Sequence, residues 1–237
     1  MAKHGKKYRE VVKLVEKTKH YTPAEAIALA KKTTFVKFDP TLELHVVLNL
    51  DPNKADQQLR GTITLPHGTG KKQRILVFAK GEKELEAKKA GADHVGNTDL
   101  IEKIKGGWFE FDVAVATPDM MAEVGKIAKI IGTKGLMPNP KSGTVTMDIE
   151  KTIEALKKGR VEYRLEKQPI VHTFFGKASF TDAQLVDNLR ALVDAILRAK
   201  PRGAKGQYLK SAALNASMGP GIALDVSALI DITKSKD

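Results

Sequence analysis

Two continuous apolar runs near the middle of the chain constrain the fold most. Residues 74–79 (R-I-L-V-F-A) and 111–117 (F-D-V-A-V-A-T) have the composition of strands that are buried on both faces. Segments with helical character follow them, at 82–90 and from Pro118 to Ile131. Strands that alternate with short helices predict βαβ units and a small parallel sheet.

The sequence on either side of this region has a different pattern. Residues 42–50 and 160–166 alternate apolar and polar side chains, which predicts strands with one face in water. Residues 170–176 are expected to form an antiparallel partner for 160–166. Two further strands are expected at 209–217 and 221–226.

Two helices have clear start signals. Thr22 is expected to be an N-cap, with Pro23 at the first helical position and Glu25 at the third. Thr181 is expected to cap a long amphipathic helix that ends near residue 199, with Gln184 three positions after the cap.

These patterns predict an α+β protein of two domains, one inserted into the other. Residues 1–67 and 159–237 are expected to form a discontinuous antiparallel α/β sandwich. Residues 68–158 are expected to form an inserted three-layer, Rossmann-like α/β domain. The net charge of the split domain is +9 and that of the insertion is +3, so a surface for a polyanion is expected on the split domain.

The charge balance points to nucleic acid. The 237 residues include 40 Lys and Arg against 28 Asp and Glu, a net charge of +12. There is no cysteine, which excludes disulfides and cysteine-based zinc sites and fits a reducing cytoplasm. No apolar run reaches the roughly 20 residues that span a bilayer, so no membrane association is expected.

The alternative is a two-domain nucleotide-binding enzyme that uses the βαβ insertion. H-G-T-G-K-K at 67–72 resembles the end of a phosphate loop, but Leu65 stands where the first Gly is needed and Lys72 where Ser or Thr is needed. The first buried strand is followed by one Gly, whereas a dinucleotide site needs three. The six histidines lack metal-ligand spacing, so no catalytic residue, metal or cofactor is expected.

A Gly- and Pro-rich loop covers Gly132 to Val145, G-T-K-G-L-M-P-N-P-K-S-G-T-V. Its prolines lack backbone donors and its glycines permit unusual backbone angles, so neither helix nor central strand is expected there. A long basic loop of this kind is typical of a functional surface.

Three other features suggest contact with RNA, each with a structural alternative. The basic N-terminal cluster K-H-G-K-K-Y-R is either a phosphate clamp or a frayed terminus. Phe38 is either a core residue or an aromatic that stacks on a base. The turn at 217–220 places Met218 at a hairpin tip beside Gly219, either for structural reasons or to let the backbone approach a ligand.

Several segments together resemble one family. They are K-H-G-K-K-Y, K-F-D-P-T-L-E-L, D-P-N-K-A-D-Q-Q-L-R-G-T-I-T-L-P-H-G-T-G-K, G-A-D-H-V-G, F-D-V-A-V-A-T-P-D-M-M, the loop at 132–145 and S-M-G-P. In this order they resemble the bacterial large-subunit ribosomal protein L-one family, over essentially the whole chain. The loop is the most specific of these segments.

The resemblance implies a cytoplasmic, non-enzymatic protein of the large ribosomal subunit, monomeric off the ribosome. It implies that the split domain binds large-subunit rRNA in the mobile stalk beside the tRNA exit site, that the protein assists release of deacylated tRNA, and that it represses its own operon mRNA. A free-standing translational repressor without a ribosomal role is the further alternative.

The resemblance also implies contact residues. Those for rRNA and mRNA are Lys37, Phe38, Thr41, Glu43, Ser211, Ser217, Met218 and Gly219, with Lys3, His4, Lys6 and Lys7 nearby. Lys134 and Lys141 are implied to lie in a loop that faces tRNA. The family usually has Thr where this chain has Ser217, so the hydroxyl is kept and a methyl group is lost.

Overall fold

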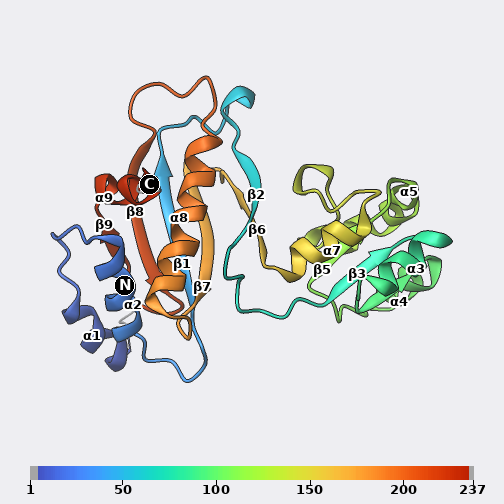
Figure 1. Cartoon of the computed structure of the whole chain (residues 1–237), viewed down its shortest axis with the longest axis horizontal. Helices are drawn as coiled ribbons and strands as arrows, with labels where there is room; N and C mark the ends of the chain where they lie inside the picture. Colours follow the sequence, from blue (N-terminus) through green and yellow to red (C-terminus); the bar gives the residue numbers. More distant parts are fainter. Residues whose placement is uncertain (1–4, 235–237) are drawn as a thin grey trace. The chain divides into compact units, whose positions relative to one another are not determined.

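The computed structural model describes residues 5–234, apart from the side chain of Lys141. The chain divides into two compact units, drawn in Figure 1. Unit 1 contains the chain up to Gly70 and from Gly159 onward, and unit 2 is Lys71–Lys158. The mixture of helices with several separate sheets agrees with the predicted α+β class.

The main sheet of unit 1 has the strand order β7-β1-β8-β9, with every neighbouring pair antiparallel. The strands are β1 (Thr41–Leu48), β7 (Ile170–Lys177), β8 (Leu209–Ala216) and β9 (Ile222–Leu224). In β1 every second side chain is buried, from Leu42 to Leu48, which confirms the predicted alternation. One face of the sheet therefore carries the core and the other is partly open.

Three helices pack on the buried face of this sheet: α2 (Pro23–Lys32), α8 (Asp182–Arg198) and α9 (Val226–Lys234). Figure 1 shows α8 running along the sheet. The predicted capping boxes are present, because Thr22 and Thr181 accept hydrogen bonds from the backbone N–H groups of Glu25 and Gln184, whose side chains bond back. The helix α9 was not predicted from the sequence.

Two short elements precede α2. They are α1 (Lys6–Val11) and the 3₁₀ turn η1 (Val12–Leu14), and neither contains a buried residue. The segment that follows joins the sheet at Tyr21, whose N–H donates to the carbonyl of Ala223 at 2.9 Å. This bond joins the segment after η1 to the residues of β9.

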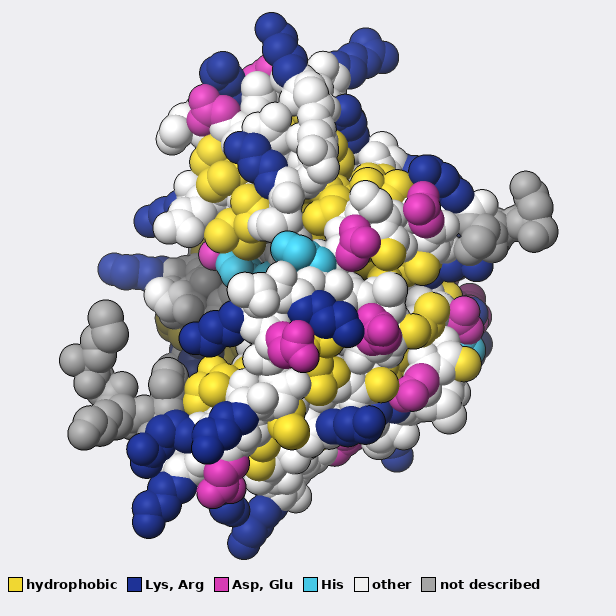
Figure 2. Space-filling view, turned by 90° about the vertical axis from the view of Figure 1, so that its left-hand side faces the viewer, with side chains coloured by type: hydrophobic (Ala, Val, Ile, Leu, Met, Phe, Trp, Pro, Cys, Tyr) yellow, Lys and Arg dark blue, Asp and Glu magenta, His cyan; other side chains and the backbone are white. Residues whose placement is uncertain are grey.

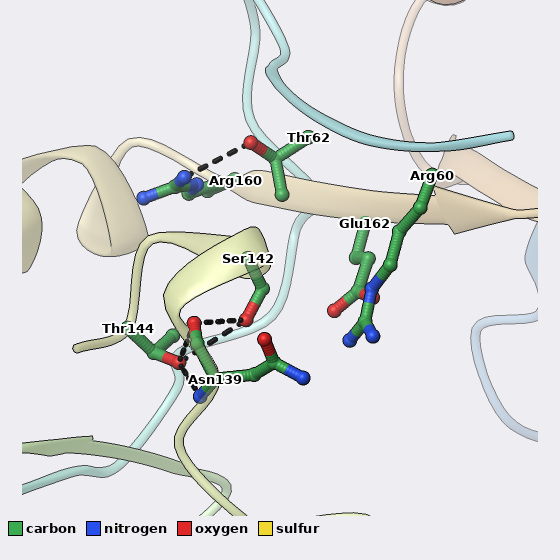
Figure 3. Close-up of polar contacts among 7 residues, drawn as sticks. All are labelled: Arg60, Thr62, Asn139, Ser142, Thr144, Arg160 and Glu162. Atoms are coloured by element: carbon green, nitrogen blue, oxygen red, sulfur yellow. Dashed lines mark hydrogen bonds and ion pairs between the residues drawn. The ribbon is translucent and has the colours of Figure 1, made fainter.

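A separate two-stranded ribbon is formed by β2 (Arg60–Thr64) and β6 (Arg160–Arg164), and the 3₁₀ turn η2 (Ala55–Gln57) precedes it. Arg60 pairs with Glu162 at 2.6 Å, and Arg160 donates to the Thr62 hydroxyl at 2.9 Å (Figure 3). The predicted pairing of 160–166 with 170–176 is wrong except for one bridge, Leu165 to Val171. The reason is that β7 pairs with β1, which leaves β6 to pair with β2.

The chain leaves and re-enters unit 1 at adjacent points. The Asn188 side chain, fully buried in α8, accepts from the N–H of His67 at 3.0 Å and donates to the carbonyls of Gly68 and Phe175 at 3.0 and 2.8 Å. Gly159 has φ +91°, and a Cβ there would lie 2.5 Å from the Cα of Gly68. Only a residue without a side chain fits this crossing.

Unit 2 contains a three-stranded parallel sheet of order β4-β3-β5. The strands are β3 (Ile75–Phe78), β4 (His94–Gly96) and β5 (Val113–Ala116). Ile75 and Val77 pack with α3 (Glu82–Lys89) and α7 (Ile149–Lys157), whereas Leu76 and Phe78 pack with the helices of the opposite face, beginning with α4 (Thr98–Lys105). Helices therefore cover both faces, as the continuous apolar runs predict.

The predicted single helix from Pro118 to Ile131 is wrong in detail. The segment is four short pieces: η3 (Pro118–Met120), α5 (Met121–Val124), η4 (Gly125–Ile127) and α6 (Ala128–Thr133). Pro118 begins the segment and Gly125, a poor helix former, interrupts it. Since α6 continues to Thr133, the prediction that the loop contains no helix is wrong for Gly132 and Thr133, and η5 (Pro140–Ser142) adds a 3₁₀ turn.

Candidate nucleic-acid interface

The open face of the main sheet in unit 1 brings together three predicted contact residues. Thr41 and Glu43 lie on this face of β1, each partly exposed beside a buried neighbour. Ser211 is exposed in β8 and pairs with Val47 of β1, so it lies on the same face. The strand period of two therefore places Thr41, Glu43 and Ser211 on one surface.

The turn after β8 is bonded to the start of β1. The N–H of Ser217 donates to the carbonyl of Thr41 at 2.9 Å, and the N–H of Thr41 donates to the Ser217 hydroxyl at 3.2 Å. That hydroxyl in turn donates to the Thr41 carbonyl at 3.3 Å. The Ser217 side chain thus holds the turn in place, which a Thr hydroxyl would do in the same way.

Met218 has an unusual backbone conformation. Its φ is +68°, and among the described residues it is the only non-glycine residue with a positive φ. The residue is 69% exposed. The left-handed region costs a non-glycine residue about 1–2 kcal/mol. The turn is fixed on both sides, since the N–H of Gly219 donates to the carbonyl of Ala216 at 2.7 Å. Backbone strain of this kind clusters at functional sites, and here it occurs at an apolar residue that is exposed to solvent.

Lys37 and Phe38 precede β1 in an exposed segment. Phe38 is 56% exposed, so the alternative that it is a core residue is wrong. It stands three residues before Thr41, and the reach of the chain places it within about 10 Å of that residue. Phe38 therefore lies at the same end of the sheet as the Ser217–Gly219 turn.

The basic N-terminal residues divide into two pairs. Lys3 and His4 lie outside the described residues. Lys6 and Lys7 are exposed in the first turn of α1 and line a cavity of about 550 Å³ together with Met218 and Gly219. The structure thus places this described pair beside the turn after β8.

Three residues of the open face were not predicted. His45 lies between Glu43 and Val47, and its Nε2 is 2.5 Å from the Oδ1 of Asn215, so the imidazole donates this bond. Its Nδ1 is 2.6 Å from the Nδ1 of His172, and one hydrogen is shared between them. The alternation of β1 already assigns His45 to the face of Glu43, but His172 and Asn215 required the strand pairing.

The loop at 132–145 in unit 2 is held by its own polar groups (Figure 3). The carbonyl of Asn139 accepts from the hydroxyls of Ser142 and Thr144 at 3.0 and 3.2 Å, and its N–H donates to Thr144 at 2.8 Å. Lys134 lies over the ring of Phe109, with Nζ 4.2 Å from the ring centroid. The segment is therefore an ordered surface, and η5 contains Lys141.

The segment that resembles a phosphate loop lies between the two units along the chain. Residues 67–72 lead directly into β3 rather than into a helix, so they offer no helix N-terminus for a phosphate. Within residues 5–234 no group of three or more His, Asp or Glu side chains is placed to hold a metal ion. No helix in that range is long and apolar enough to cross a membrane.

An antiparallel sheet with an open polar face, exposed apolar side chains at one end and nearby lysines is typical of an RNA-binding protein. Figure 2 shows lysine and arginine side chains next to hydrophobic ones on one face of the molecule. Residues 29–220 match the Ribosomal protein L1p/L10e family, and the chain belongs to this family. The predicted family is thereby confirmed.

Membership of the family establishes the general function. The chain is a ribosomal protein that binds rRNA of the large subunit. The family is one of structural ribosomal proteins rather than a class of enzymes, and it gives no support to the nucleotide-binding alternative.

Proposed function

We propose that unit 1 is the rRNA-binding domain and that its contact surface runs from the turn after β8 along the open face of the main sheet. The observation that carries this proposal is the strained, exposed Met218, held beside Thr41 by three hydrogen bonds. The proposed contacts are Lys3, His4, Lys6, Lys7, Lys37, Phe38, Thr41, Glu43, Ser211, Ser217, Met218 and Gly219.

The residues of this surface have different roles. Lys6, Lys7 and Lys37 neutralise phosphates and supply affinity that does not depend on sequence. Phe38 and Met218 pack against unstacked bases or riboses, and Glu43 and Ser211 form hydrogen bonds that include 2′-hydroxyl groups. Because Ser211 and Met218 are seven residues apart along β8 and its turn, the surface extends about 20 Å.

Unit 2 is proposed to act on tRNA. It is the inserted domain, and we place Lys134 and Lys141 of its ordered loop toward the tRNA in the exit site. The protein then assists release of deacylated tRNA from the mobile stalk. The same rRNA-binding surface also represses translation of the protein's own operon by binding a similar mRNA structure.

A filter-binding titration against a large-subunit rRNA fragment, at two salt concentrations, tests the proposed surface. Wild-type protein is expected to bind the rRNA fragment more tightly than DNA of the same sequence. Lys37→Gln is expected to weaken binding and to lower the salt slope by about one unit. Equal affinity for RNA and DNA, or a Lys37 variant with an unchanged slope, would contradict the proposal.

Two further measurements separate the alternatives. A free-standing repressor would bind the operon mRNA but would not co-sediment with large subunits. A nucleotide-binding enzyme would show a saturable thermal shift with nucleotides. We expect co-sedimentation with large subunits and no such shift.

A further inference from the structure

The cavity beside Met218 is built from three separate segments of unit 1. Its lining comes from residues 5–8, from Phe35 after α2, and from Met218 and Gly219 after β8. Its volume of about 550 Å³ lies within the range of small-ligand sites. The sequence patterns did not single out Phe35, and Tyr8 drew notice only as the aromatic within the basic cluster.

The walls and the rim of the cavity differ in chemistry. Tyr8, Phe35 and Met218 supply two aromatic rings and a thioether, whereas Lys6 and Lys7 supply positive charge. No acidic side chain lines the cavity in the described part of the chain. Aromatic walls with a cationic rim match an unstacked base and its phosphate better than they match an apolar peptide.

The cavity is continuous with the proposed rRNA surface, because Met218 and Gly219 belong to both. RNA that lies on the open face of the sheet therefore passes directly beside the cavity. None of the residues of α1 is buried, and a helix of six residues is not stable in water by itself. A base placed between Tyr8 and Met218 would add an apolar contact to α1.

We propose that this cavity holds one unstacked nucleotide of the bound RNA. The base packs against Tyr8, Phe35 and Met218, and its phosphate lies at Lys6 and Lys7. This inference rests on the proposed function, because it assumes that the open face binds rRNA. It adds a subsite for a single nucleotide that contacts α1.

Filter binding of full-length variants to the large-subunit rRNA fragment provides the first test. Tyr8→Ala is expected to raise the dissociation constant on the order of ten-fold, the usual contribution of an aromatic stacked on a base, with an unchanged salt slope. Tyr8→Phe keeps the ring and is expected to bind like wild type. Lys6→Gln is the matched charge variant, for which the salt slope falls by about one unit.

Abasic substitutions scanned along the fragment provide the second test. At one position, removal of the base is expected to weaken binding to the wild-type protein but not to Tyr8→Ala. The base and the Tyr8 ring form one contact, so the loss of both costs no more affinity than the loss of either. The proposal is overturned if Tyr8→Ala binds like wild type. It is also overturned if the loss of affinity from every abasic position simply adds to the loss from Tyr8→Ala. If wild type fails to bind the fragment at all, the proposed function fails instead, so the two failures are distinguishable.

Discussion

Met218→Ala tests whether the strained turn serves binding rather than folding. Met218 is 69% exposed, so removal of its side chain is expected to change the free energy of unfolding by less than about 0.5 kcal/mol. If RNA buries this side chain, the loss of three heavy atoms, at about 0.8 kcal/mol for each methylene-sized group, weakens binding by about 2 kcal/mol. That corresponds to a roughly 30-fold higher dissociation constant.

The assay is filter binding to the large-subunit rRNA fragment at two salt concentrations, with thermal unfolding measured in parallel. The salt slope is expected to stay unchanged, because the substitution removes no charge. Met147→Ala is the matched control, since Met147 is 52% exposed but belongs to unit 2.

A third variant isolates the backbone strain. Met218→Gly also removes the side chain, but glycine tolerates positive φ whereas alanine keeps the strain. The free energy of unfolding of Met218→Gly is therefore expected to exceed that of Met218→Ala. The two variants are expected to bind RNA with equally low affinity. The reasoning is refuted if the Met218 and Met147 variants bind alike, or if Met218→Ala loses as much stability as affinity.

The remaining predictions concern the stability and autonomy of unit 1. Gly159→Ala is expected to lower the free energy of unfolding in urea by about 2–5 kcal/mol, because the residue has φ +91° and a Cβ would lie 2.5 Å from the backbone of Gly68. The control Gly125→Ala should not lower it, because the space around Gly125 is open. In Tyr163→Phe the free energy of unfolding should fall by about 1 kcal/mol, because the hydroxyl no longer donates to the carbonyl of Ala195. In Tyr208→Phe it should not fall, since the buried Tyr208 hydroxyl has no hydrogen-bond partner among the described residues. Equal losses in the two variants would contradict this. Burial raises the pKa of Tyr208, so this hydroxyl ionises in the unfolded chain at a lower pH than in the folded protein. The free energy of unfolding should therefore fall above about pH 10, and it should fall less steeply in Tyr208→Phe. Unfolding measured at about pH 9 and about pH 11 tests this. Deletion of 71–158 with a short Gly-Ser join should retain most rRNA affinity, because the two chain ends lie next to each other; a folded deletion variant that does not bind would place the RNA surface elsewhere.

Local sequence signals predicted the elements that local physics determines. The capping boxes at Thr22 and Thr181 formed as expected, because the cap bonds link residues three positions apart. The burial of β3 on both faces and of β1 on one face also agrees with the prediction, because the apolar pattern of a strand indicates how many of its faces are buried. The prediction of a single helix after Pro118 was wrong, because short 3₁₀ turns depend on packing that periodicity does not show.

The sequence also predicted part of the candidate site. Thr41 and Glu43 share a face through the strand period alone. The conformation of Met218 could not be predicted, since methionine rarely adopts positive φ, and the bonds that fix the turn include those between Ser217 and the distant Thr41. Phe35 gave no signal, because its position in the cavity depends on how α1 and the turn after β8 come together.

By itself the sequence determined the kind of strand, the helix starts and the family, since these follow from side-chain type and spacing along the chain. Tertiary structure alone decided that β6 pairs with β2, that His172 and Asn215 join His45, and that Tyr8, Phe35 and Met218 surround one cavity. These contacts join residues up to 210 positions apart in the printed sequence. Their free energy comes from packing and pairing across the whole unit, which no local pattern contains.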